Sequence, residues 1–209
     1  MNKKMGKRRS KWRAIQWLRE WNHKRLHDRW RGRRWIPYEE WIARNEMSLG
    51  SAVASQLVTL VVDVSGATKA QIGRMARCIL AQSHLQWELL VVHDAASSAR
   101  AGDLLAAVRS AGHAGMARPL GQWRGAGAAQ LGQCINGEWA CILPVDVLMH
   151  DKALTEALAG LDTCRHAEVI YADQDQNYND GVRFAPHFKP DFNIEMLLSW
   201  NYVGRTFLI

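Results

Sequence analysis

The stretch "LVTLVVDV", residues 57–64, decides the fold. It is apolar and β-branched almost throughout, which is typical of a strand covered on both faces by helices. A Ser-Gly-Ala-Thr turn follows, and then "KAQIGRMARCILAQ", residues 69–82, places apolar residues at helical spacing. This order of strand, turn and helix predicts the first unit of an α/β sheet.

The same alternation continues along the chain. "WELLVVHD" (87–94) predicts a second buried strand, and a helical segment with Leu104, Leu105 and Val108 follows it. Further along, the pattern predicts a helix within 122–139, a third strand "WACILPV" (139–145), a helix near 151–161 and a fourth strand "AEVIYAD" (167–173). An Asn-Asp-Gly signal at 179–181 then predicts a loop or hairpin. We therefore expect an α/β fold with a mostly parallel sheet flanked by helices.

Aspartates stand at or just after the predicted ends of these strands. An open α/β sheet binds its ligands outside the carboxyl ends of the strands. One aspartate there is usually a helix cap or a turn former, but five in equivalent places predict an oxygen-rich rim. Such a rim suits a phosphate-bearing ligand with Mg²⁺ or Mn²⁺. The five are Asp63, Asp94, Asp146, Asp173 and Asp175.

The turn after the first strand excludes two other ways of binding phosphate. "DVSGATKAQIG" contains neither the GxGxxG pattern of dinucleotide-binding folds nor the GxxxxGK[ST] pattern of the P-loop. A Rossmann dehydrogenase and a P-loop enzyme are therefore disfavoured.

The first 46 residues have a composition of their own. They hold 15 of the 27 Lys/Arg, 5 of the 20 Asp/Glu and six of the ten tryptophans, so their net charge is +10 while the remainder is −3. We predict a basic, Trp-rich helical extension over 1–46 and an α/β domain over 56–209. The extension is suited to bind an anionic membrane surface. An equally favoured alternative is a solvated helix that packs a few tryptophans on the domain or on a partner. Nucleic-acid binding is the least favoured alternative.

Other features of the sequence indicate where in the cell the protein is located. Its apolar runs fall short of the ~20 residues that span a bilayer, and no apolar stretch follows the basic start as in a secretory signal. We expect a cytoplasmic protein, peripheral at the inner face of the cell membrane if the extension binds lipid. The four cysteines have no CxxC spacing, so we expect reduced, mostly buried thiols.

Four quoted segments carry a resemblance to a known family. They are "YEEWIARNE" (38–46), "ILAQSHLQWELLVVHDAASS" (79–98), "NGEWACILPVDVLMHDKAL" (136–154) and, most specifically, "VIYADQDQNYNDGVRFAPHFKPDFNIEMLLSWNYVG" (169–204). Taken in order, they resemble family 2 glycosyltransferases of the GT-A fold, in the bacterial branch that builds O-antigen and other surface polysaccharides. The resemblance covers about residues 38–209.

The resemblance implies an inverting transfer of a sugar from a nucleotide-diphosphate donor to a saccharide or lipid-linked acceptor, with Mg²⁺ or Mn²⁺ as cofactor. By position it assigns Asp146 to the metal, Asp94 to the nucleotide base and Asp63 to the start of the nucleotide pocket. It places Asp173 and Asp175 on the donor or acceptor side of the cleft, and Lys189 beside a phosphate or a carboxylate.

This chain departs from the family pattern at several positions, and these departures favour an alternative function. Where relatives have an Asp-x-Asp-Asp run, this chain has Pro144, Val145 and Val147 around a single Asp146, and His93 replaces the first aspartate of a pair. The sequence stops where relatives continue toward a general base, so no catalytic residue is assigned and we expect a truncated enzyme. The alternative is a degenerate, non-catalytic relative that binds a membrane or a partner protein.

Overall fold

A computed structural model describes residues 36–46, 55–113, 116–121, 127–162, 164, 166–178 and 181–209. The chain divides into two compact units, Met1–Ser48 and Leu49–Ile209. The described part of the first unit is helix α2 (Tyr38–Asn45), which begins after Pro37 and carries Glu39 and Glu40 in its first turn. Residues 1–35, and with them most of the predicted basic extension and its contact with membrane or nucleic acid, lie outside the described residues.

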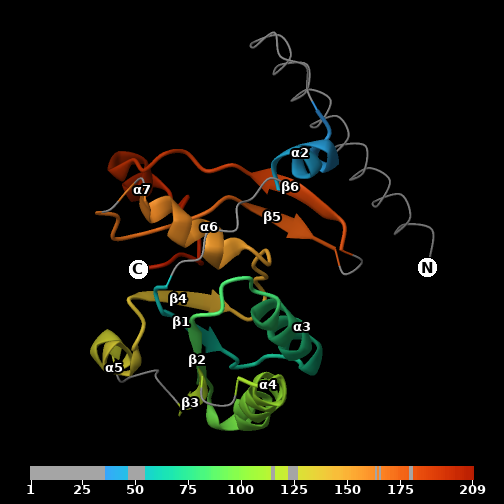
Figure 1. Ribbon diagram of the computed structural model, residues 1–209, viewed down its shortest axis with the longest axis vertical. Coiled ribbons are helices and arrows are strands. Elements are labelled where there is room, and N and C mark those ends of the chain that lie inside the picture. Colours follow the sequence, from blue (N-terminus) through green and yellow to red (C-terminus); the bar gives the residue numbers. More distant parts are fainter. Residues whose placement is uncertain are drawn as a thin grey trace, which may run out of the picture. The chain divides into compact units, whose positions relative to one another are not determined.

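A four-stranded parallel sheet forms the centre of the second unit (Figure 1). Its strand order is β3-β2-β1-β4, so the first strand predicted from the sequence is an inner strand with a neighbour on each side. The prediction of a mostly parallel α/β sheet flanked by helices is confirmed. The strands are β1 (Val58–Asp63), β2 (Trp87–Val92), β3 (Ala117–Gly121) and β4 (Trp139–Pro144).

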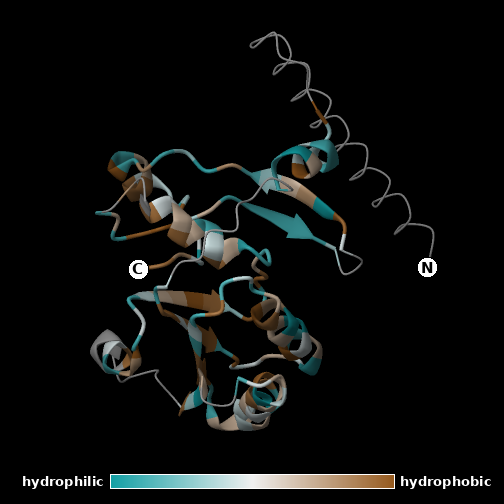
Figure 2. Ribbon diagram, in the orientation of Figure 1, coloured by the Kyte–Doolittle hydropathy of each residue, from teal (hydrophilic) through white to brown (hydrophobic). Residues whose placement is uncertain are grey.

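Helices cover both faces of this sheet, as Figure 1 shows: α3 (Lys69–Leu80) and α4 (Ser98–Ser110) lie on one side, and α5 (Gly127–Cys134) lies on the other. Side chains of β1 alternate between the two faces. Leu60 and Val62 join the core beneath α3 and α4, whereas Val61 packs with Leu131 of α5. Strands β1, β2 and β4 are apolar along most of their length, and the brown colour in Figure 2 marks these apolar residues.

Helix α3 has a start signal in its sequence. The Thr68 hydroxyl accepts a hydrogen bond from the Gln71 backbone N–H at 3.3 Å, and the Gln71 side chain accepts one from the Thr68 backbone N–H at 2.9 Å. This capping box satisfies two donors that the first turn of a helix leaves without partners. The buried face of the helix is Ile72, Met75, Ala76 and Ile79.

Strand β3 was missed by the sequence analysis, which took residues 139–145 as the third strand. β3 is an edge strand that pairs only with β2 among the described strands, and its residues 118 and 119 are exposed. Arg118 and Pro119 remove the apolar signal, and proline is tolerated in sheets mainly at such edges.

The predicted fourth strand at residues 167–173 was wrong. In that segment only Ile170 forms a bridge, with Leu208, which also bridges Cys141 of β4. The strands that follow are β5 (Gln174–Asn177) and β6 (Arg183–His187), an antiparallel pair. Of the loop or hairpin predicted from Asn-Asp-Gly, the structure has the hairpin, and its first strand already includes Asp175. Helix α6 (Ala153–Ala159) precedes this region and α7 (Ile194–Ser199) follows it.

The cysteines are free thiols with different exposures. Cys141 is buried, Cys78 and Cys134 are half-buried, and Cys164 is exposed, so the expectation of mostly buried thiols holds only in part. Burial raises the pKa of the Cys141 thiol to about 12, and the nearby Cys78 adds to this shift. No helix in the described part of the chain is long and apolar enough to cross a membrane.

Candidate functional site

The strand order creates a switch point between β1 and β4. From β1 the chain proceeds through β2 to β3 on one side, and it then returns to place β4 on the other side of β1. In open α/β sheets, ligands bind in the crevice outside the carboxyl ends of the two strands at such a point. Asp63 is the last residue of β1 and lies opposite Pro144, and Asp146 follows β4 by two residues. The chain therefore places a carboxylate on each side of the switch point.

Asp94 adds a third carboxylate at the same edge. It follows β2, whose last residue, Val92, lies opposite Asp63. Asp63 Oδ1 accepts a hydrogen bond from Ser65 N at 2.9 Å, and Asp94 Oδ1 accepts one from Ser97 N at 2.8 Å. The Ser97 hydroxyl in turn accepts the Gly66 N–H at 3.0 Å. These bonds tie the loops after β1 and β2 to each other, so both aspartates shape the rim as well as contribute charge.

Asp146 is paired with a cation of the protein. Its Oδ2 lies 2.8 Å from the Arg205 guanidinium, and both side chains are more than half exposed. The hydrogen bond from Arg205 is the main reason that the pKa of Asp146 lies below its usual value, and the arginine charge lowers it further. Arg205 was not singled out by the sequence analysis, although it directly follows the Asn-Tyr-Val-Gly segment that carried the resemblance.

The side chains around Asp146 do not fit a resident divalent cation. Magnesium and manganese in proteins are held by several oxygen ligands. Across the residues that the structure describes, no three His, Cys, Asp or Glu side chains are grouped so that they could hold a metal ion. A metal at Asp146 would also have to share this carboxylate with Arg205, whose positive charge opposes a second cation there. The expectation of Mg²⁺ or Mn²⁺ stays a prediction.

Asp173 and Asp175 do not follow a strand of the parallel sheet. Asp173 precedes β5 and Asp175 belongs to it, because the predicted strand 167–173 does not form. Asp175 Oδ2 is 2.5 Å from Arg183 Nε across the hairpin, and Asp173 Oδ1 accepts the Lys189 backbone N–H at 2.7 Å. Both carboxylates thus stabilise the hairpin and the segment after it, and their contact with a donor or acceptor stays a prediction.

The segment Tyr202–Arg205 connects the hairpin region to the edge of the parallel sheet. The Lys189 ammonium donates to the Val203 carbonyl at 2.6 Å, and the buried Tyr202 hydroxyl accepts the Asn193 N–H at 2.8 Å. At the end of this segment, Arg205 contacts Asp146. Lys189 and Asp146 are therefore both linked to residues 202–205, a connection that the sequence patterns alone could not predict.

A small pocket lies on the hairpin itself. Its volume is about 290 Å³, and it does not include the aspartates at the edge of the parallel sheet. Trp200 and His187 lie beside each other in its wall, with ring centres 5.4 Å apart. The lining residues are Gln174, Asp175, Gln176, Ala185, His187 and Trp200.

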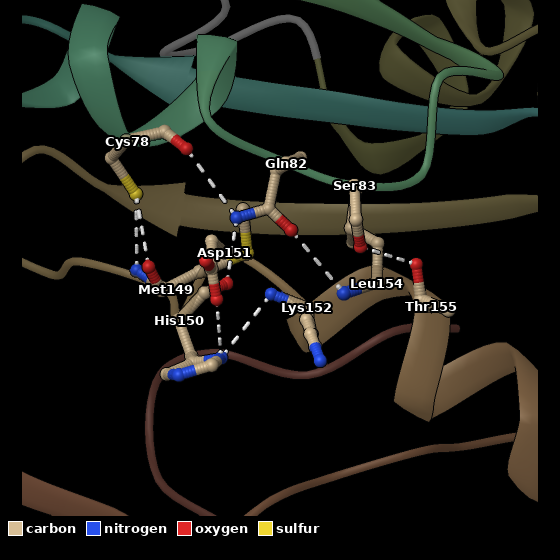
Figure 3. Close-up of polar contacts among 9 residues, drawn as sticks. All are labelled: Cys78, Gln82, Ser83, Met149, His150, Asp151, Lys152, Leu154 and Thr155. Carbon is tan, nitrogen blue, oxygen red and sulfur yellow. Dashed lines mark hydrogen bonds and ion pairs between the residues drawn. The ribbon is translucent and has the colours of Figure 1, made fainter. Parts of the chain in front are cut away.

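The loop that carries Asp146 is held by the end of α3 (Figure 3). Gln82 donates from Nε2 to the His150 carbonyl at 2.7 Å and accepts the Leu154 N–H at 3.3 Å. Nearby, the Cys78 sulfur accepts the Met149 N–H at 3.1 Å. A buried amide and a thiol of α3 thus fix the path of the chain between β4 and α6.

Comparisons with known proteins find distant relatives, and no family model matches the sequence. The uncharacterized protein y4gI of Sinorhizobium fredii is 28% identical over 152 residues, which are 71% of this chain and 17% of that protein. The O-antigen biosynthesis protein RfbC of Myxococcus xanthus is 28% identical over 156 residues, which are 73% of this chain and 12% of that protein. The chain thus spans less than a fifth of the length of either relative.

One similar solved structure is the mannosyltransferase PcManGT from Pyrobaculum calidifontis in complex with GDP-Man and Mn²⁺. The alignment covers 59% of this chain and 39% of the mannosyltransferase chain. The identity is 18% and the TM-score is 0.44.

Proposed function

We propose that this chain is the donor-binding part of a glycosyltransferase, which moves a sugar from a nucleotide diphosphate to a saccharide or lipid-linked acceptor with inversion. The α/β fold, the resemblance of residues 38–209 and the relative named for O-antigen biosynthesis support a glycosyltransferase in general terms. No residue of this chain is assigned as the general base that an inverting transfer needs.

The observation that carries the proposal is the switch point between β1 and β4, with Asp63 and Asp146 at its two sides. Asp94, on the next strand end, suits a hydrogen bond to a nucleotide base, because a carboxylate accepts from ring N–H and amino groups. The diphosphate would lie toward Arg205, which pairs with Asp146 just after the end of β4.

Donor binding tests the proposal directly. Purified protein is heated alone and with UDP-glucose, dTDP-glucose or GDP-mannose, each with Mn²⁺ and with EDTA. We expect one donor class to raise Tm by about 5 °C or more at saturation, since ligands that bind only the folded state stabilise it. Asp94→Asn should lose most of this shift, measured from its own unliganded Tm. Asp103→Asn, at an exposed ion pair on α4, is the matched control. No shift with any donor in either condition would contradict the proposal.

A non-catalytic binding protein is the second candidate. Helix α7 and the residues before it expose large apolar side chains, with Phe192 64% exposed, Ile194 55% and Leu198 82%. Exposed apolar side chains that cluster in this way are typical of contact surfaces. This candidate predicts that the protein neither hydrolyses nor transfers any of the three donors. Release of UDP, dTDP or GDP from a donor by the purified chain would exclude it.

A further inference from the structure

We propose that Arg205 and Lys189 together bind the donor diphosphate, so that donor binding does not require a divalent cation. The inference rests on the proposed donor site, and it differs from the sequence-based expectation, which gave this charge to Mg²⁺ or Mn²⁺ at Asp146. Side-chain cations would then neutralise the charge that grows on the leaving diphosphate.

Gly204 places the Lys189 ammonium against the residue that precedes Arg205. Its φ of +89° lies in the left-handed region, which glycine adopts without strain. A Cβ added there would meet Lys189 Nζ at 3.3 Å and Gln174 Oε1 at 3.0 Å. The lysine ammonium therefore lies directly against the backbone that carries Arg205, and glycine leaves this contact open.

Lys189 is held in a position suited to an anion. Its Nζ donates to the Val203 carbonyl at 2.6 Å and lies 5.9 Å from the centre of the Tyr171 ring. An ammonium has three N–H donors, and this carbonyl takes one of them. Partial burial lowers the pKa of Lys189, while the charge of Asp173 raises it. A phosphate oxygen would restore the solvation that burial removes from the charged form.

Arg205 supplies the geometry that a phosphate needs. A guanidinium donates two parallel hydrogen bonds to the oxygens of one phosphate, which a lysine does not do. In the unliganded protein it is held by Asp146 at 2.8 Å, with side chains 65% and 52% exposed. Such an exposed ion pair contributes at most about 1 kcal/mol to stability. A ligand with two or more negative charges therefore takes the place of Asp146 at little cost in free energy.

Asp146 then has a different function from metal binding. It keeps Arg205 directed toward the switch point until the donor arrives, and it does so with a single carboxylate. This explains why one aspartate suffices here although the surrounding residues, Pro144, Val145 and Val147, offer no second ligand.

Calorimetric titration of the full chain tests the inference. UDP, dTDP, GDP and inorganic pyrophosphate are each titrated in the presence of EDTA and in the presence of Mn²⁺. We expect the preferred nucleoside diphosphate to bind with the same affinity within about twofold in both conditions, and its monophosphate to bind at least about tenfold more weakly. Arg205→Gln should raise Kd about tenfold or more, the loss of roughly one charge-assisted interaction, and Arg205→Lys should recover part of it. Arg100→Gln, at an exposed ion pair on α4, should leave Kd unchanged.

The possible outcomes separate the two proposals. Binding that requires Mn²⁺ and is unaffected by Arg205→Gln would overturn the inference and leave the donor site standing. A different result would support the anion site and contradict the donor site. In it, pyrophosphate binds in EDTA, Arg205→Gln weakens this binding, and no nucleoside diphosphate is preferred. If neither pyrophosphate nor any nucleotide binds, both proposals are wrong. Circular dichroism of each variant checks that the exposed substitution leaves the fold unchanged.

Discussion

At the scale of single residues, Gly137 has the most restricted surroundings of the described glycines. It lies between α5 and β4, where its N–H donates to the Thr59 hydroxyl at 2.9 Å. A Cβ there would meet the Leu57 carbonyl oxygen at 2.6 Å and the Thr59 backbone nitrogen at 2.7 Å. Both atoms belong to the backbone at the start of β1, so neither yields by a change of rotamer.

Gly137→Ala should therefore lower the free energy of unfolding by about 1–3 kcal/mol, the usual cost of overpacking. Gly102→Ala is the matched control, because a Cβ at Gly102 of α4 meets nothing within 4 Å. There alanine should raise stability by up to about 1 kcal/mol through its higher helix propensity. Urea unfolding curves measure both changes, and shifts of the same sign in the two variants would contradict the packing described for Gly137.

At the scale of elements, the junction between α3 and the loop after β4 decides where Asp146 lies. Gln82 is 3% exposed and bonds to the His150 carbonyl and the Leu154 N–H, where this loop meets α6. Gln82→Leu keeps the volume but leaves the His150 carbonyl and the Leu154 N–H without these partners.

We expect Gln82→Leu to cost about 1–3 kcal/mol in urea unfolding, because the buried Leu154 N–H loses its Gln82 acceptor. Gln133→Leu, at an exposed position of α5, should change stability by less than about 0.5 kcal/mol. A Gln82 variant as stable as the Gln133 variant would mean that the loop holds its path without this amide.

The buried elements were predictable from the sequence and the exposed ones were not. β1, β2 and β4 are covered on both faces, so their apolar runs identify them. β3 and the hairpin strands are largely exposed, and their residues are mostly polar or contain proline. Residues 167–173 carry an apolar pattern, but they meet another strand only through Ile170. None of these residues is buried, and Val169 is 47% exposed, so the apolar pattern here corresponds neither to burial nor to a strand.

For the candidate site, too, the sequence predicted only what a local pattern indicates. Asp63, Asp94 and Asp146 were found because each follows a strand that the pattern predicts. Arg205 was missed because its relation to Asp146 spans 59 residues and depends on how the chain returns to the sheet. Local patterns contain no information on such a contact.

At the scale of the whole molecule, the charge is divided between the two units. Residues 1–46 carry a net charge of +10 and the remainder carries −3. If the extension binds lipid, the attraction is electrostatic and screened by salt. The full chain should then sediment with phosphatidylglycerol vesicles at about 0.1 M NaCl and be released at about 0.5 M.

Two controls accompany this membrane experiment. Vesicles of phosphatidylcholine alone should bind little of the full chain, and residues 49–209 alone should not bind either kind of vesicle. Equal binding of the short and full chains would assign the membrane contact to the α/β unit instead.

The return of residues 202–209 to the sheet affects how the protein is made. Ile209 exchanges two backbone hydrogen bonds with Ala140, and Leu208 exchanges two with Ile170. These residues leave the ribosome after every other part of the described fold, and domains acquire structure from the amino terminus during translation. The parallel sheet can therefore form on the nascent chain before Arg205 reaches Asp146. The proposed donor site is complete only after synthesis has passed Arg205.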